Sequence, residues 1–115
     1  MRMGNNLKTL YHTIRDETPT PNDFLSNVEK GRPLPRDPYR QRLAQGISCW
    51  GTLAQAREMA QQFPSQGRFI AEIVLEEQTS LQYERTTASE GHWTVWGESD
   101  VLIRCIQAVY PVEEA

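Results

Sequence analysis

The stretch RFIAEIVL at residues 68–75 opens the part of the chain that decides the fold class. Three more runs rich in β-branched and aromatic residues follow it: LQYERT at 81–86, HWTVW at 92–96 and VLIRCIQAVYPV at 101–112. Each run predicts a strand, and we expect the last to be one long closing strand with a kink near Asp100 or Arg104. No helical pattern separates these runs, so the sequence predicts an α+β fold rather than a parallel α/β sheet.

The strongest helical pattern of the chain lies just before this stretch, at Thr52–Phe63. Thr52 and Gln55 have the spacing of a capping box, in which two side chains satisfy free backbone amides at the start of a helix. Pro64 and Gly67 mark its end. Apolar residues recur at helical spacing, which predicts a face packed on the sheet: Leu53, Ala56, Met59, Ala60 and Phe63.

Toward the N-terminus, two further strands and two short helices complete the predicted order. Leu7–Arg15 and Ile47–Trp50 are strand-like runs. Asn22–Lys30 predicts a short helix, because cap-type residues begin it and Gly31 follows it. Tyr39–Gln45 predicts one or two helical turns. The sequence therefore predicts one domain over residues 1–115, compact, with five to six strands and two to three short helices.

Composition argues against several classes of protein. No apolar run approaches the roughly 18 residues of a transmembrane helix, and the first residues lack the apolar segment of a secretory leader. The net charge of −3 argues against general nucleic-acid binding. Cys49 and Cys105 lie in apolar runs without CxxC spacing, so we expect buried, reduced thiols, no metal site and a cytoplasmic location.

Charge is divided unevenly along the chain. Residues 1–45 carry eight basic and five acidic residues, whereas the remainder carries four basic and ten acidic residues. Ten of the twelve basic residues are arginines, whose fixed fork of donors suits phosphate or carboxylate ligands. Four arginines flank a proline-rich loop: Arg32, Arg36, Arg40 and Arg42. Two interpretations stay open, a solvated basic loop and a flap over an anionic ligand.

Three segments, taken in order, resemble motifs of one known family. The first is the Tyr-His pair in LYHTIR at residues 10–15. The second is GISCW at 46–50, together with the alanine-containing helix that follows it. The third is HWTVWG at 92–97, followed by the final apolar run. These segments resemble the ADP-ribosyltransferase superfamily, which includes poly(ADP-ribose) polymerases and bacterial mono-ADP-ribosylating toxins. The resemblance implies a split sheet or half-barrel.

The resemblance also implies a site for NAD and a role for particular residues. His12 falls at the strand-one position that holds a ribose or a phosphate, with Arg15 as a phosphate partner. Ser48 falls at the second-strand position that helps to place nicotinamide. In such enzymes a carboxylate stabilises the positive charge that develops on the ribose when nicotinamide leaves. By resemblance, Glu90 and His92 lie in that catalytic region.

The sequence departs from the family pattern at the residue on which the chemistry depends. His92 occupies the position of the family's glutamate, and imidazole supplies no negative charge there. Glu90 lies two residues earlier, which displaces it by about 6.5–7 Å along an extended strand. Thr13 replaces a glycine of the first motif, and Ser48 replaces the usual tyrosine.

These departures favour a divergent module that binds a nucleotide or a protein partner over an efficient transferase. The alternative is an active NAD-dependent mono-ADP-ribosyltransferase of toxin type. Each candidate residue also has a purely structural interpretation: His12 and Ser48 as ordinary strand residues, and Glu90 as a solvated carboxylate in a turn.

Overall fold

The part of the chain that the structure describes forms one antiparallel sheet of six strands with three α-helices, which confirms the predicted α+β class. The computed structural model describes residues 7–76, 80–86 and 91–113. The strands are β1 (Lys8–Ile14), β2 (Ile47–Trp50), β3 (Phe69–Leu75), β4 (Gln82–Arg85), β5 (His92–Trp96) and β6 (Ile106–Pro111). The helices are α1 (Pro38–Ala44), α2 (Leu53–Gln62) and α3 (Ser99–Arg104), with 3₁₀ turns η1 (Pro21–Phe24) and η2 (Pro64–Gln66).

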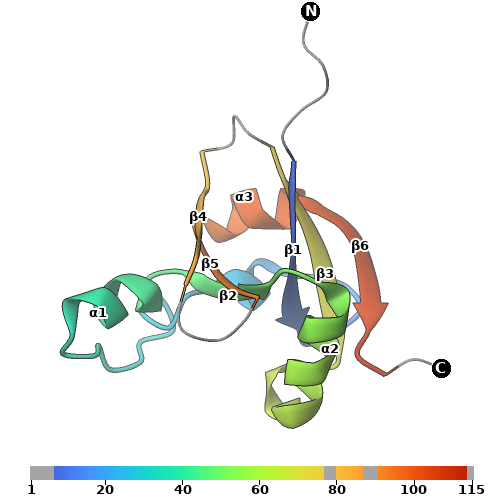
Figure 1. Ribbon diagram of the computed structural model, residues 1–115, viewed down its shortest axis with the longest axis horizontal. Coiled ribbons are helices and arrows are strands. Elements are labelled where there is room, and N and C mark those ends of the chain that lie inside the picture. The colour runs from blue at the N-terminus through green and yellow to red at the C-terminus, as the bar shows by residue number, and fades with distance from the viewer. Residues whose placement is uncertain (1–6, 77–79, 87–90, 114–115) are drawn as a thin grey trace, which may run out of the picture.

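The sheet has two halves that meet at its centre. The strand order is β4-β5-β2-β1-β3-β6. β1 pairs with β3 along all seven of its residues, whereas its register with β2 consists of Tyr11 opposite Trp50. Figure 1 shows β2, β5 and β4 on one side of this junction and β1, β3 and β6 on the other. Helix α1 stands apart at the outer side of the first half.

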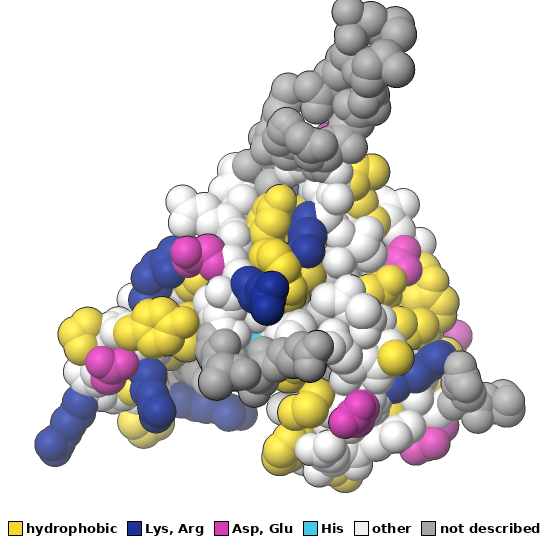
Figure 2. Space-filling view, viewed as in Figure 1, with side chains coloured by type: hydrophobic (Ala, Val, Ile, Leu, Met, Phe, Trp, Pro, Cys, Tyr) yellow, Lys and Arg dark blue, Asp and Glu magenta, His cyan; other side chains and the backbone are white. Residues whose placement is uncertain are grey.

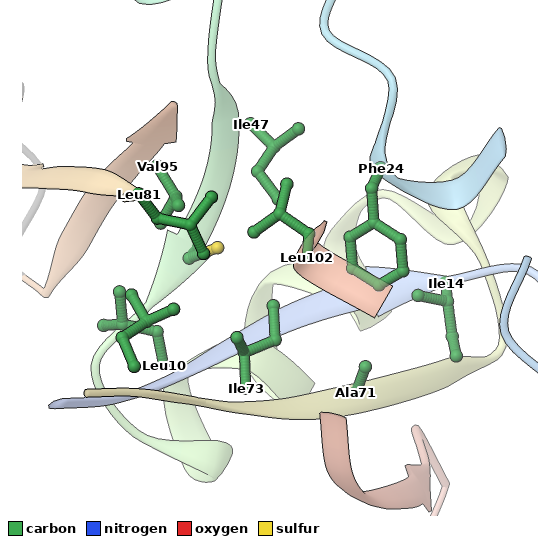
Figure 3. Close-up of a cluster of buried hydrophobic side chains, with 11 residues drawn as sticks. Leu10, Ile14, Phe24, Ile47, Ala71, Ile73, Leu81, Val95 and Leu102 are labelled. Carbon is green, nitrogen blue, oxygen red and sulfur yellow. The ribbon is translucent and has the colours of Figure 1, made fainter. Parts of the chain in front are cut away.

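Apolar side chains pack on both faces of the sheet. On one face, strand residues such as Leu10 and Ile73 form a core with Phe24 of η1 and Leu102 of α3. In Figure 3, Phe24 and Leu102 lie over β1 and β3, beside Ile14. On the other face, Ala56 and Ala60 of α2 pack against a second cluster, made by Ile70 and Val112 with the partly buried Tyr11, Trp50 and Leu53. The period-two alternation of the strands therefore separates two apolar layers.

Helix α2 begins as the sequence predicts but ends before its last predicted contact. The Thr52 hydroxyl accepts a hydrogen bond from the Gln55 amide at 3.1 Å, which caps the first turn. Ala56 and Ala60 are buried. The prediction that Phe63 packs on the sheet is wrong: Phe63 is the C-terminal cap residue and is 49% exposed. Its backbone has left the helix with φ −127° and ψ 69°, so the side chain no longer follows the helical stripe.

Two other predicted elements differ from the structure. Asn22–Lys30 is not one helix, because Leu25 is extended and only η1 and a set of turns remain. The segment 101–112 is not one kinked strand: its first residues belong to α3, and β6 starts at Ile106. Asp100 and Arg104 form an i,i+4 ion pair on α3, which is a contact that a helix places on one side.

Glu72 links three strands on the face that α2 covers. The hydroxyls of Tyr11 on β1 and Tyr110 on β6 both donate to its Oε1, at 3.3 and 3.1 Å. Desolvation and the Glu72 charge raise the pKa of Tyr11. The hydrogen bond to Glu72 and its charge raise the pKa of Tyr110. Both phenols therefore stay protonated as donors, and the carboxylate holds β1, β3 and β6 together.

Both cysteines are free thiols. Cys49 is buried, as expected, while Cys105 is partly buried. Burial raises the pKa of both thiols, which lowers their reactivity because the thiolate is the nucleophile. Among the described residues, no helix combines the length and the apolar character that crossing a bilayer requires.

Two phenylalanines test this packing directly. Phe24 is fully buried and Phe63 is 49% exposed. We expect Phe24→Ala to lower the free energy of unfolding by about 3–5 kcal/mol, because it leaves a cavity in the core. The same change at Phe63 should alter it by less than about 0.5 kcal/mol. Denaturant unfolding of both variants measures the difference, and equal losses would contradict the described core.

Candidate functional site

A cleft of about 890 Å³ opens where β1 and β2 part. If the antiparallel ladder between β1 and β2 continued, Thr13 would lie opposite Ser48 on the same face as Tyr11 and Trp50. The described register between the two strands contains the pair Tyr11 and Trp50 and does not extend to Thr13 and Ser48. The cleft is lined by the end of β1, by η1, by the turns after it and by β2. Its charged lining residues are Arg15, Asp16, Asp23, Lys30 and Arg32. We call it the first cleft.

His12 joins two walls of the first cleft. Its Nδ1 lies 2.7 Å from the carbonyl oxygen of Ser48 on β2, and its Nε2 lies 2.6 Å from the carbonyl oxygen of Asp23 on η1. The ring also packs against Phe24, with ring centroids 5.1 Å apart. Burial lowers the pKa of His12, although the two carbonyls and the Asp23 charge oppose this effect. The imidazole thus takes the place of the backbone pairing that β1 and β2 lack here.

Asp23 fixes the adjoining turn by using both carboxylate oxygens. Oδ1 accepts from the Arg15 amide at 3.1 Å, and Oδ2 accepts from the Thr20 amide at 2.9 Å. Thr20 and Asp23 form a capping box at the start of η1. The carboxylate is therefore engaged by the backbone. Within the described part of the chain, the side chains of Arg15, Lys30 and Arg32 are in no ion pair, so their charges are available to a ligand.

A second cleft of about 590 Å³ adjoins the first and shares Asn27, Leu43 and Ser48 with it. We call it the second cleft. It lies between α1, which contributes Tyr39 and Arg40, and the strands β2 and β5, which contribute Ser48 and His92. Ser48 is paired with Thr94 in the β2–β5 ladder, and Trp50 with His92. Ser48 and His92 therefore stand on the same face of the sheet.

His92 belongs to a small polar network at the back of the second cleft. Its Nδ1 lies 3.1 Å from the hydroxyl of Thr86, and that hydroxyl lies 2.7 Å from the hydroxyl of Thr94. The ring meets the edge of Trp50, with centroids 4.9 Å apart. Burial lowers the pKa of His92. These contacts favour a neutral imidazole that is held in place by neighbouring hydroxyls.

Arg42 links helix α1 to the sheet through its side chain and its backbone carbonyl. Arg42 pairs with Glu84 of β4, and its guanidinium lies 4.1 Å from the ring centroid of Trp96. The Trp96 indole N–H donates to the Arg42 carbonyl at 2.8 Å. Arg32, Arg36 and Arg40 are exposed beside it, and Figure 2 shows Lys and Arg side chains gathered around α1. The loop interpretation and the flap interpretation of this segment both remain predictions.

The structure brings three of the residues chosen from the sequence into one cleft. His12, Arg15 and Ser48 all line the first cleft, while His92 lines the second together with Ser48. His12 lies between the core residues Leu10 and Ile14 on β1, so it projects from the opposite face to His92. Glu90 lies outside the described residues.

Sequence reasoning missed several residues of these clefts. Lys30, Asp23, Thr86 and Thr94 were not singled out. Thr20 and Asp23 have capping-box spacing, which is a signal that the sequence offered. Thr86 and Thr94 gave no signal, because their contact depends on the pairing of β4 with β5.

Comparisons with protein-family models, curated proteins and solved structures return no match. Within residues 7–76, 80–86 and 91–113, no group of three or more His, Cys, Asp or Glu side chains gathers as metal ligands would.

The two histidines make stability depend on pH. Burial places the folded-state pKa of His12 and of His92 below the ordinary value of 6.5. Just below pH 6.5 the unfolded chain therefore binds more protons than the folded protein, so the free energy of unfolding falls as the pH drops. The contribution is complete above pH 6.5.

Denaturant unfolding between pH 7.5 and 5.5 measures this dependence, over a window set by the ordinary histidine pKa. The double variant His12→Gln/His92→Gln is the matched control, since it should flatten the dependence in that window. A wild-type protein whose stability rises toward pH 5.5 would contradict the direction of both pKa shifts.

Proposed function

We propose that the chain binds a nucleotide through its phosphates in the first cleft, with NAD as the ligand. The observation that supports this most is the gathering of Arg15, Lys30 and Arg32 around one cleft of about 890 Å³. That size suits a small-molecule ligand, and arginine forks match phosphate oxygens well. Ser48, at the boundary with the second cleft, offers a hydroxyl to the same ligand.

The contacts of His12 argue against the ribose or phosphate contact that the family resemblance implies for it. Both of its ring nitrogens lie within hydrogen-bond distance of backbone carbonyls. We therefore assign the phosphate contacts to Arg15, Lys30 and Arg32, and give His12 the task of holding the walls of the cleft. The lining also includes the carboxylates of Asp16 and Asp23, so the two phosphates of NAD meet three cations and two carboxylates.

Binding rather than efficient transfer is the activity we propose. Ribose transfer requires a carboxylate beside the developing positive charge. Among the described residues, the second cleft is lined by no Asp or Glu. In the first cleft, Asp23 already accepts hydrogen bonds from two backbone amides, and the other carboxylate of the lining, that of Asp16, is exposed to solvent. An active mono-ADP-ribosyltransferase is the alternative, and Glu90 is the residue that would carry it.

The proposal includes a cytoplasmic location, supported by the two free thiols. A protein partner is a second candidate ligand. The observation that favours it is the exposure of Leu34 and Tyr39, at 53% and 51%, beside the arginines of the loop and α1.

Charge-removing variants test the nucleotide proposal. We expect NAD⁺ to bind the wild-type protein in isothermal titration calorimetry. Arg15→Gln and Arg32→Gln should each weaken binding at least about tenfold, since a charge-assisted hydrogen bond contributes about 1.5–3 kcal/mol. Arg85→Gln is the matched control: Arg85 is exposed on β4 and lines neither cleft. Equal effects of all three variants, or no binding by wild type, would remove the proposal.

A variant that gains NAD⁺ hydrolysis tests whether His92 occupies the position of the family's catalytic glutamate. We expect wild-type protein to release little or no nicotinamide from NAD⁺. We place the nicotinamide end of NAD⁺ past Ser48, in the second cleft that His92 lines. His92→Glu restores a carboxylate at the family position there, so it should raise NAD⁺ hydrolysis, with about 10²–10³-fold as the scale of such electrostatic stabilisation. The measurement is nicotinamide release over time.

Two comparisons make this experiment decisive. His92→Gln has a similar size without the charge and should release no more nicotinamide than wild type. Glu90→Gln separates the alternative: robust automodification by wild type that disappears in this variant would establish a transferase and overturn the binding proposal.

A further inference from the structure

Each ring nitrogen of His12 faces a hydrogen-bond acceptor, so both contacts are hydrogen bonds only if both nitrogens carry a proton. Both neighbours of the ring nitrogens are backbone carbonyl oxygens, at 2.7 and 2.6 Å, and a carbonyl oxygen only accepts. A neutral imidazole has one N–H, so its other nitrogen presents a lone pair to a carbonyl lone pair. Only the doubly protonated ring donates to Ser48 and Asp23 together. Because burial lowers the pKa of His12, the ring near neutral pH donates to one of the two carbonyls, and acidification supplies the second donor.

The two carbonyls belong to opposite walls of the first cleft. The Ser48 carbonyl is on β2, and the Asp23 carbonyl is on η1, whose cap residue Thr20 and residue Asn22 also line the cleft. Loss of one proton therefore releases either β2 or η1 from the ring. Because a close contact between two acceptors is repulsive, the released wall moves away from the ring.

We propose that His12 is a proton-dependent lock, which holds η1 against β2 when its ring carries two protons and thereby strengthens the binding of an anion in the first cleft. This inference rests on the nucleotide binding proposed above. His12 is a positioning residue in it, since it acts through the cleft walls and contacts no ligand.

The charges around the ring decide when the lock closes. The Asp23 carboxylate on η1 favours the imidazolium, and the Lys30 ammonium opposes it. The neighbouring strands contribute Ser48 on β2 and Ala71, the register partner of His12 on β3, neither of which titrates. Burial also opposes the charged ring. A bound anion adds negative charge on the cleft side, so it favours the charged ring.

Binding and protonation are then coupled in both directions. If the anion favours the doubly protonated ring, acid must strengthen anion binding by the same factor. The expected effect is tighter NAD⁺ binding at pH 5.5 than at pH 7.5, by about fivefold or more, the lower end of typical coupling. NAD⁺ suits this test because its pyrophosphate is a diester and keeps the same charge over this range.

Nuclear magnetic resonance tests the lock without any ligand. The chain has two histidines, and a His92→Gln spectrum assigns their ring signals. On acidification we expect both His12 ring nitrogens to become protonated. The carbonyl ¹³C signals of Ser48 and Asp23 should shift with the same midpoint, because both carbonyls then accept a hydrogen bond. A ring that gains its second proton without moving either carbonyl signal would refute the lock.

Calorimetry at the two pH values tests the coupling. In wild type, NAD⁺ affinity should rise toward pH 5.5, and added NAD⁺ should raise the titration midpoint of His12. His12→Gln donates from one amide only, so it should bind with an affinity that no longer changes with pH. If this variant does not fold, the midpoint shift in wild type decides the coupling alone.

The outcomes separate the two proposals. Absence of NAD⁺ binding at both pH values refutes the proposed function, while the ligand-free spectra still decide the lock. Binding that does not change with pH, with no shift of the His12 midpoint, overturns the coupling and leaves the nucleotide site standing.

Discussion

The pairing of Tyr11 with Trp50 is the contact on which the arrangement of the molecule depends. At this pair β1 meets β2, while along its other edge β1 is paired with β3 over its whole length. An antiparallel ladder that continued would close the sheet between Thr13 and Ser48. Instead the His12 side chain reaches the Ser48 carbonyl. The first cleft therefore exists because the two halves of the sheet are joined by a short piece of ladder and one imidazole.

This junction also explains why so polar a cleft is compatible with a small core. The apolar residues divide into a large cluster under η1 and α3 and a small one under α2. Each half of the sheet is covered where its strands are paired. The opening lies where pairing stops, and capping contacts from Asp23 satisfy the local backbone amides of Arg15 and Thr20. These two amides are therefore satisfied although no strand pairs with them, as a stable fold requires.

Much of the fold could be predicted from local pattern. Five strand positions, the second part of the sixth strand, the cap at Thr52 and helix α1 all follow from alternation, capping residues and glycine or proline stops. Two wrong predictions concern residues 101–104 and Phe63. VLIR at 101–104 has the β-branched composition of a strand, but tertiary packing of Leu102 against the core makes it a helix. Phe63 continues a helical stripe in the sequence, but the helix ends one residue earlier.

The candidate site was predictable only in part, for a related reason. The resemblance of two short motifs, LYHTIR and GISCW, is what singled out His12 and Ser48, and both residues line the first cleft. The carbonyl oxygens that His12 meets belong to backbone, and no sequence pattern specifies a backbone partner 36 residues away. Likewise, Lys30 and Arg32 reach the first cleft through turns, whose path depends on where η1 packs.

The positions of the tryptophans make intrinsic fluorescence specific for one half of the sheet. All three tryptophans lie on β2 and β5, at positions 50, 93 and 96, while β1, β3 and β6 have none. Intrinsic indole fluorescence therefore observes one half of the sheet. The tyrosines Tyr11 and Tyr110 lie in the other half, on either side of Glu72. Tyr39 on α1 and Tyr83 on β4 lie on the tryptophan side, so a Tyr39→Phe/Tyr83→Phe variant confines the tyrosine signal to the other half. Tyrosine and tryptophan signals followed together in that variant would distinguish separation of the two halves from unfolding of the whole chain.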